Sequence, residues 1–203
     1  AYLRLLANED DDPAYIRAAT TPKRGIGAAT LQVLGTYAGE RHVSLFAAAF
    51  EEGFAHRVAP RQLEPLLEFG QFINRMQERA GRESANLVLP DLLKAIDYET
   101  YLYDHEEERV AQTRWANVCE FANWINKKGE LDGKTLIELT QSIALINMLD
   151  KQNDEEVDAV QLSTLHASKG LEYPHVFLVG VEEGILPHRE STEPSKVEEE
   201  RRL

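Results

Sequence analysis

The stretch LLEFGQFINRMQERA, residues 66–80, decides the fold class of this 203-residue chain. Its apolar residues recur every three or four positions, which places them on one face of a helix. They are Leu66, Phe69, Ile73, Met76 and Ala80. The same spacing recurs at Ala111, Trp115, Val118, Ala122 and Ile125. Because this periodicity extends from about residue 14 to residue 149, the sequence predicts a mainly α protein.

The second of these helices has charged ends that fit a helix dipole. Acidic residues 106–108 lie in its expected first turn and basic residues 127–128 in its last, so both ends are stabilised. Gly129 follows and is expected to cap the C-terminus. We interpret Trp115 and Trp124 as core residues rather than as platforms for base stacking.

The pattern changes after an acidic connector at residues 151–158. Residues 160–165 (VQLSTL) alternate as a half-buried strand does, and residues 175–180 (HVFLVG) form the apolar run typical of a buried parallel strand. The nine residues between them are near the lower limit for a parallel crossover. The sequence therefore predicts a small α/β segment with two parallel strands. Two strands do not form a stable sheet alone, so its other strands are expected outside the chain.

Charge and composition limit the classes of partner. The chain carries 22 basic and 35 acidic residues, and a net charge of −13 excludes a surface that is basic all over. The segment from Arg17 to His42 is an exception, with four basic residues against one acidic residue. Any nucleic-acid contact must therefore use small basic sites on an acidic body.

Two further exclusions concern cysteine and membranes. The single cysteine, Cys119, excludes an internal disulfide framework and a zinc site built from cysteines. The longest apolar runs, residues 44–50 and 176–181, fall far short of the roughly 18–20 residues needed to cross a bilayer. We expect a soluble, cytoplasmic protein with no membrane partner. A helical pattern that starts at Ala1, with no initial Met, predicts that the chain belongs to something longer.

The first candidate site is the segment TPKRGIG, residues 21–27, which precedes a helical pattern. Two glycines around one apolar residue permit a close approach of the backbone, and the start of the next helix offers free N–H groups to an anion. Lys23, Arg24, Gly25 and Gly27 are therefore candidates for contacts with a DNA backbone. The alternative is a simple turn between helices with solvated charges.

The second candidate site is formed by residues 164–174 (TLHASKGLEYP) and 180–188 (GVEEGILPH). Polar side chains follow the end of an expected buried strand, where open α/β sheets bind ligands. His166, Lys169 and Glu172 each have an ordinary explanation as loop or surface residues when taken singly. Together they favour a ligand site.

These motifs resemble those of the Rep/UvrD/PcrA-type DNA helicases of superfamily 1A. The resemblance covers essentially the whole chain, and the segments Ala167-Ser168 and Asp97-Tyr98-Glu99 bring it closest to the Rep branch. Residues 164–172, the Gly-x-Glu-Glu-Gly-x-x-Pro-His stretch that ends at His188, and residues 199–203 are similar to motif V and the start of motif VI. Residues 21–27 are similar to the Gly-Ile-Gly element of the family's 2B domain, and residues 2–6 to the helix after motif IV.

The resemblance implies a domain organisation and a set of site residues. Residues 1–13 would be the end of a 2A helix and a connector, residues 14–157 an all-helical 2B domain, and residues 158–203 part of the RecA-like 2A domain. It implies duplex contacts by Lys23, Arg24, Gly25 and Gly27, and single-strand contacts by Thr164, His166, Lys169 and His188. Gly170 and Glu172 would belong to the nucleotide site. No catalytic residue and no metal ligand is expected in this chain.

The resemblance also implies an activity for the longer protein, namely ATP-dependent 3′–5′ DNA unwinding with ATP and Mg2+ in replication or repair. The chain contains no Gly-x-x-x-x-Gly-Lys-[Ser/Thr] loop and stops before the arginine finger of motif VI, so it should be inactive alone and bind no cofactor. Expected partners are DNA at a single-strand/duplex junction, the remainder of the motor, and replication or repair proteins, in the bacterial cytosol at the nucleoid. The alternative is a helical protein-interaction or autoinhibitory module with only incidental DNA contact.

Overall fold

A computed structural model describes residues 1–152, 159–182, 184–186, 189 and 193–200 of the chain. The chain divides into two compact units, Ala1–Asp154 and Glu155–Leu203, which we describe separately. Helices account for most of the described residues, which confirms the prediction of a mainly α protein. None of the described helices combines the length and the apolar character needed to span a membrane.

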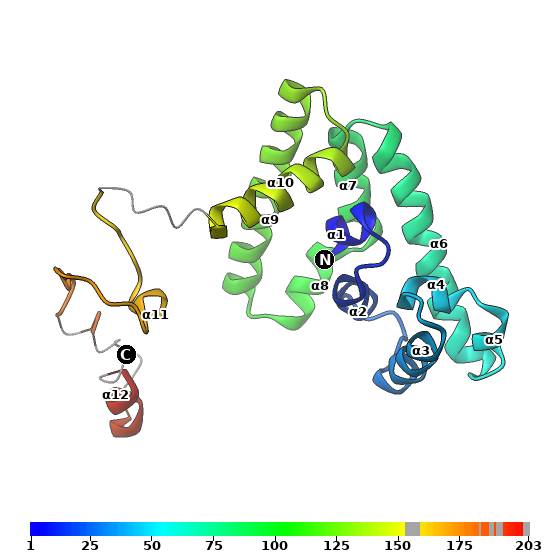
Figure 1. The fold of residues 1–203 in the computed structure, drawn as a ribbon, viewed down its shortest axis with the longest axis horizontal. Helices are drawn as coiled ribbons and strands as arrows, with labels where there is room; N and C mark the ends of the chain where they lie inside the picture. Colours follow the sequence, from blue (N-terminus) through cyan, green and yellow to red (C-terminus); the bar gives the residue numbers. More distant parts are fainter. Residues whose placement is uncertain (153–158, 183, 187–188, 190–192, 201–203) are drawn as a thin grey trace. The chain divides into compact units, whose positions relative to one another are not determined.

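The first unit is built from ten helices in its described part (Figure 1). They are α1 (Tyr2–Ala7), α2 (Asp12–Thr20), α3 (Ala28–Arg41), α4 (Leu45–Ala49), α5 (Glu52–Ala55), α6 (Pro60–Arg82), α7 (Ala85–Ala95), α8 (Tyr98–His105), α9 (Glu108–Asp132) and α10 (Leu136–Gln152). The second unit contains α11 (Leu165–Ser168) and α12 (Pro194–Glu200) among its described residues.

Local sequence explains where the early helices begin. The Asp11 carboxylate accepts a hydrogen bond of 3.0 Å from the Ala14 N–H, and Pro13 occupies the first turn of α2, where its missing N–H has no consequence. The Ser44 hydroxyl accepts from the Ala47 N–H at 3.2 Å and caps α4 in the same way. These caps fix the residues at which α2 and α4 begin.

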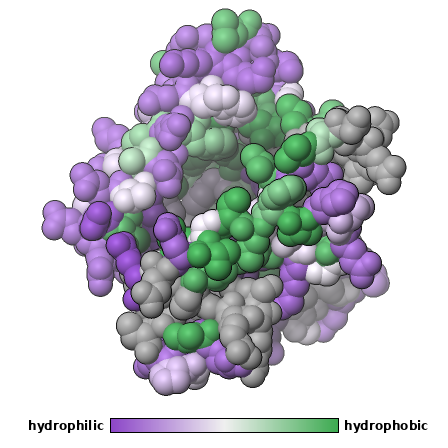
Figure 2. Space-filling view, turned by 90° about the vertical axis from the view of Figure 1, so that its left-hand side faces the viewer, coloured by the Kyte–Doolittle hydropathy of each residue, from purple (hydrophilic) through white to green (hydrophobic). Residues whose placement is uncertain are grey.

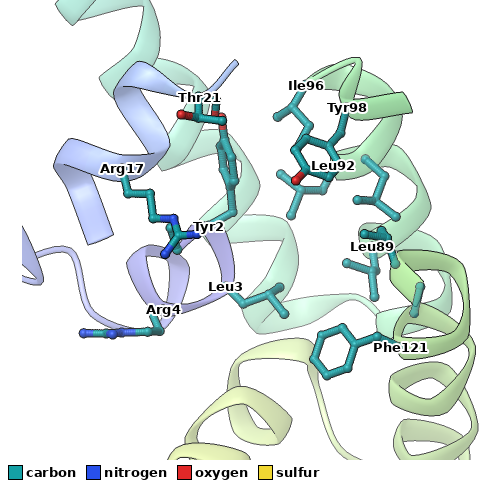
Figure 3. Close-up of a pocket in the computed structure, with 14 residues that line it drawn as sticks. Tyr2, Leu3, Arg4, Arg17, Thr21, Leu89, Leu92, Ile96, Tyr98 and Phe121 are labelled. Carbon is teal, nitrogen blue, oxygen red and sulfur yellow. The ribbon is translucent and has the colours of Figure 1, made fainter. Parts of the chain in front are cut away.

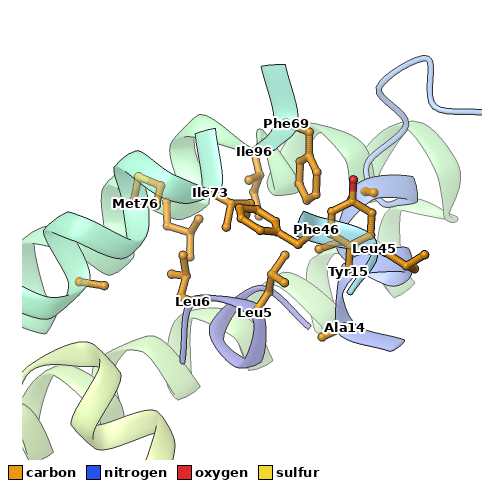
Figure 4. Close-up of a cluster of buried hydrophobic side chains, with 14 of the residues drawn as sticks. Leu5, Leu6, Ala14, Tyr15, Leu45, Phe46, Phe69, Ile73, Met76 and Ile96 are labelled. Atoms are coloured by element: carbon orange, nitrogen blue, oxygen red, sulfur yellow. The ribbon is translucent and has the colours of Figure 1, made fainter. Parts of the chain in front are cut away.

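The core of the first unit forms along α6, as its apolar spacing predicts. All five residues of the predicted stripe are at most 5% exposed. They pack against α1 and α4, where Leu5, Leu6 and Phe46 are buried (Figure 4). Burial of each large apolar side chain stabilises the fold by about 1.5–3 kcal/mol. The short helices α1 and α4 are therefore stabilised by packing against the long helix α6.

Helix α9 differs from its prediction at three places, one of which is its last turn: because the helix extends to Asp132, residues 127–128 precede that turn, and it holds no basic residue. Trp124 is 46% exposed and stacks on Phe121 with a ring separation of 6.1 Å, so its interpretation as a core residue is wrong. The helix also continues through Gly129 and ends at Gly133, whose φ of +62° suits a glycine cap. Gly129 is buried, and an added Cβ at this position would lie only 3.1 Å from a methyl group of Leu139. Glycine is therefore required at position 129 by close packing against Leu139 and not by the end of the helix.

The two predicted strands do not form in the described part of the second unit. Residues 160–164 and 176–180 are not paired as strands, and residue 165 begins α11. Val160, Leu162 and Phe177 are each about 90% exposed, and Figure 2 shows hydrophobic residues at the surface of the chain. The physical reason is that an isolated pair of strands has no further sheet to bury its apolar faces. The α/β segment is thus not confirmed, and the assignment of 2A and 2B domains stays a prediction.

Helix α1 lies within residues 1–13, for which the resemblance implies the end of a 2A helix and a connector, and that assignment stays a prediction. The helix packs on α2, α6 and α10, and Leu5 and Leu6 are buried in the core of the first unit. The N-terminal segment is therefore part of this unit's packing.

We predict that the contribution of one ionic network to stability depends on pH. The Tyr37 hydroxyl donates to Glu51 Oε2 at 2.6 Å, and Arg41 Nε donates to the same oxygen at 3.1 Å. The hydrogen bond from Tyr37, followed by Arg41, lowers the pKa of Glu51. A lowered folded-state pKa gives stability that is present above the ordinary pKa of about 4.3 and is lost as the pH falls through the folded value.

Tyr37→Phe should therefore destabilise the chain at pH 7, and the difference from wild type should narrow below pH 4. Urea denaturation followed by circular dichroism at several pH values measures this difference. A gap between the two proteins that stays constant down to pH 3 would contradict the assigned coupling.

Candidate nucleic-acid interface

The turn between α2 and α3 exposes the N-terminus of a long helix. Helix α3 has 14 residues, and its N-cap residue, Gly27, provides no side chain to accept from the first N–H groups. Gly25, Gly27, Ala28 and Ala29 are all exposed. The first turn of α3 therefore presents free backbone donors and the positive end of a helix dipole to the solvent.

The two glycines of this turn have different structural roles. Gly25 has a φ of +77°, which residues with a side chain adopt only with strain. Gly27 has a φ of −89° and a ψ of 160°, which any residue can adopt, and no atom lies within 4 Å of the position that its Cβ would occupy. The fold thus requires glycine at position 25. At position 27, the missing side chain leaves open space in front of the helix.

The turn is fixed to α6 by contacts on its inner side. Ile26, between the two glycines, is only 8% exposed. The position of a Cβ at Gly25 would lie 3.8 Å from Pro65 Cγ. Gln62 Nε2 donates to Thr30 Oγ1 at 3.2 Å, which ties the first turn of α3 to α6. The outer side of the turn is therefore presented by a rigid support.

The structure separates the two basic residues that the sequence places together. Lys23 is exposed, and within the described ranges no hydrogen bond or ion pair holds its ammonium group. Arg24 is half-buried, and its Nη1 donates to the carbonyl oxygens of Ala18 at 3.0 Å and Pro22 at 2.7 Å. The whole ammonium group of Lys23 is therefore open to a phosphate, whereas Arg24 already uses one terminal nitrogen for contacts within the protein.

Sequence reasoning missed Tyr2, which belongs to the support of this turn. Its hydroxyl lies 2.9 Å from the carbonyl oxygens of both Ala18 and Thr21, and Figure 3 shows Tyr2 beside Thr21. Burial raises the pKa of Tyr2 to about 12, so the hydroxyl keeps the proton that it donates well into the alkaline range. The sequence offers one signal for this role, because a tyrosine ring can pack against an arginine side chain. The sequence does not show which arginine Tyr2 would contact.

The second candidate site forms a short helix followed by a turn in the second unit. Thr164 Oγ1 accepts from the Ala167 N–H at 3.1 Å and caps α11. Gly170 has a φ of +83°, and the Leu171 N–H donates to the Ser168 carbonyl at 2.9 Å to close the turn. This local structure brings Thr164, His166, Lys169, Gly170 and Glu172 into one compact segment.

The side chains of this segment are available to a ligand. His166, Lys169 and Glu172 are exposed, and the hydroxyl of Thr164, used as an acceptor by the helix, keeps its own proton for donation. His188, the remaining predicted contact, lies outside the described residues. Across the residues that the structure describes, no group of three or more His, Cys, Asp or Glu side chains is placed to hold a metal ion.

A cavity of about 460 Å³ lies beside the first candidate site. Tyr2 and Thr21 line one wall, and Leu92 and Phe121 are among the residues that line the other (Figure 3). The cavity is mostly apolar, and none of residues 22–27 lines it. The cavity is therefore not part of the candidate DNA contact.

Comparison with known proteins relates the whole chain to one family. The family model of the UvrD-like helicase C-terminal domain matches residues 1–203. Over its full length the chain is 44% identical to the ATP-dependent DNA helicase Rep of Salmonella typhimurium and 42% identical to that of Escherichia coli, and it covers 31% of each. It is 38% identical to the ATP-dependent DNA helicase PcrA of Bacillus subtilis, of which it covers 28%. The chain thus spans less than a third of the length of these relatives.

Proposed function

The chain belongs to the UvrD-like helicase C-terminal domain family, and from this premise we propose that it is the DNA-engaging and regulatory part of an ATP-dependent 3′–5′ DNA helicase of Rep type. The names of its relatives support this proposal. Such a helicase unwinds DNA in replication or repair in the cytosol, at the nucleoid, and uses ATP and Mg2+. ATP hydrolysis belongs to the complete motor, because the phosphate loop and the arginine finger are not in this sequence.

The observation that carries the proposal is the exposed start of α3 with Lys23 beside it. Backbone N–H groups and one lysine can bind a phosphate but cannot read a base, so the contact holds a duplex without regard to its sequence. Such a contact explains how an acidic chain engages DNA at one small site. In this proposal residues 14–157 form the 2B domain, and Lys23, Gly25 and Gly27 face the duplex.

The second unit supplies the link to the motor. We assign single-strand contacts to Thr164, His166, Lys169 and His188, and nucleotide contacts to Gly170 and Glu172. Their exposure in a compact segment supports this assignment. The exposed apolar residues of 160–164 and 176–181 support a second assignment, in which the remainder of the RecA-like 2A domain supplies the strands that cover them.

We expect the chain to bind duplex DNA weakly and in a salt-dependent manner. Fluorescence anisotropy with a labelled forked DNA, repeated at several salt concentrations, gives the slope of log K against log[salt]. Lys23→Ala should reduce the magnitude of this slope by about 0.9 for the one phosphate contact that it removes.

Lys94→Ala is the matched control, because Lys94 is an exposed lysine on α7 and its loss changes the net charge equally. Its slope should stay close to that of the wild type. Equal effects of the two substitutions on the slope would mean that duplex binding depends only on net charge. If duplex binding were undetectable even at low salt, the proposed contact would be refuted.

A second candidate function is a module that binds another protein or inhibits the motor. Two observations favour it: the net charge of −13, and the exposed stacked pair of Phe121 and Trp124 on α9. The same titration decides between the functions, because this alternative predicts no duplex binding that depends on Lys23.

A further inference from the structure

We infer that Arg24 is a positioning residue, which fixes the turn that presents Lys23 and the start of α3 to the duplex, and that its own charge does not contact phosphate. This inference rests on the proposed function of the turn. It also departs from the resemblance, which implies a DNA contact for both basic residues. The geometry of the guanidinium group carries the argument.

The guanidinium group first connects a helix end with the turn. Ala18 lies in the last turn of α2, where carbonyl oxygens have no partner within the helix. Arg24 Nη1 donates to this oxygen at 3.0 Å and to the Pro22 oxygen at 2.7 Å. A positive charge at a helix C-terminus is favourable, so Arg24 caps α2 while holding the turn that follows.

The same group also lies near two aromatic rings. Its central carbon is 5.5 Å from the ring centre of Tyr2 on α1 and 5.4 Å from that of Phe69 on α6. Both distances are within the range of a cation–π interaction. Arg24 therefore joins α1, α2, α6 and the turn at one point.

These contacts depend on the shape of the side chain as well as on its charge. The planar guanidinium group can donate in its plane and face aromatic rings at the same time, whereas the ammonium group of lysine is a compact charge without a plane. The two carbonyls occupy Nη1, so a phosphate could reach Arg24 without displacing them only through its Nη2 and Nε donors, on a side chain that is already half-buried beside two rings. Lys23 has no such contacts to lose within the described ranges, so the two residues should respond differently to substitution.

Arg24→Lys, which keeps the charge, should weaken binding of the chain to forked duplex DNA by about tenfold, because it loses hydrogen bonds from a charged group. The slope of log K against log[salt] should stay at its wild-type value. In a 1H–15N spectrum, the amide cross-peaks of Gly25 and Gly27 should shift, while those of Gly35 and Gly39, farther along α3, should not. A merely global loss of stability would not produce this local pattern.

Arg79→Lys is the control for the substitution itself. Arg79 is likewise a bridging arginine, with hydrogen bonds of 2.9 Å to Glu83 and 2.8 Å to Asp91, but it lies on α6, well beyond Phe69 along that helix. It should change neither duplex binding nor the glycine cross-peaks. If Arg24→Lys does not fold, Tyr2→Phe, which removes only a hydroxyl from the same cluster, should give the same local pattern at smaller amplitude.

Each outcome decides a separate question. Wild-type binding by Arg24→Lys, together with a reduced salt slope in Arg24→Ala, would make Arg24 a phosphate ligand and overturn the inference. Unchanged glycine cross-peaks in Arg24→Lys would overturn it as well. Shifted cross-peaks in a chain that never binds duplex DNA would support the positioning of the turn by Arg24 and refute the proposed function instead.

Discussion

Gly27→Val should abolish most of the duplex affinity of the chain while its helical fold stays intact. Valine accepts the extended backbone of Gly27, and no atom lies within 4 Å of the new Cβ, so the substitution meets no obstacle inside the protein. Its side chain instead occupies the space in front of the free N–H groups of α3. Loss of even one hydrogen bond to a charged phosphate corresponds to about 1.5–3 kcal/mol, or roughly 10- to 100-fold in affinity.

Gly35→Val is the matched control for this substitution. Gly35 is exposed on the same helix, about two turns further on, and again nothing lies within 4 Å of its Cβ position. Anisotropy titration with forked DNA should give wild-type affinity for this variant and a large loss for Gly27→Val, with equal helical content by circular dichroism. Wild-type affinity in both variants would show that the turn is a structural corner and that the duplex is held elsewhere.

The sequence was sufficient to predict the helices that carry the core. Leu66, Phe69 and Ile73 are buried, as their spacing predicts. In a helix of 23 residues, a continuous apolar face is enough to predict which side packs against the other helices. The residues at which helices end were harder to predict from the sequence. Gly129 and Gly133 both suit a C-cap, and only the packing of Gly129 against Leu139 shows that the helix passes the first and ends at the second.

The strands illustrate a different limit. The run at residues 175–180 has the composition of a buried strand, yet Phe177 and Val179 are more than 80% exposed. Strand pairing is non-local, so a pattern that is suitable for a sheet forms one only when neighbouring strands are present. Composition therefore identified a segment whose apolar side chains are left exposed in this chain, but it did not determine the structure of that segment.

The candidate site was predictable as a location and not as a set of roles. Two glycines and two basic residues mark the turn, and the structure places the uncapped start of α3 directly after it. That this turn contacts DNA stays a prediction. Nothing in the sequence distinguishes Lys23 from Arg24, because the two aromatic partners of Arg24 come from α1 and α6, which are distant along the chain. A role that depends on tertiary contacts becomes visible only in the folded structure.

Of the substitutions predicted here, Phe69→Ala should cause the largest loss in the free energy of unfolding, because the Phe69 ring packs in the core and also supports the turn. Phe69 is 2% exposed and packs edge-on against Tyr15, with ring centres 5.5 Å apart (Figure 4). Truncation of a buried phenylalanine to alanine costs about 3–5 kcal/mol in the free energy of unfolding. Urea denaturation measures this loss. Phe121→Ala, at a position that is 45% exposed, should cost far less, and equal losses would contradict the assigned core.

Phe69→Leu separates the two roles of this side chain. Leucine fills much of the ring's volume against Tyr15, so the loss of stability should be smaller than for alanine. It has no aromatic face for the guanidinium group of Arg24, which now lies 5.4 Å from the ring centre. Duplex affinity should therefore fall in Phe69→Leu even where urea denaturation shows a folded chain, and the salt slope should stay at its wild-type value. A folded Phe69→Leu variant with undiminished affinity would show that the aromatic contact of Arg24 contributes nothing to the presentation of the turn.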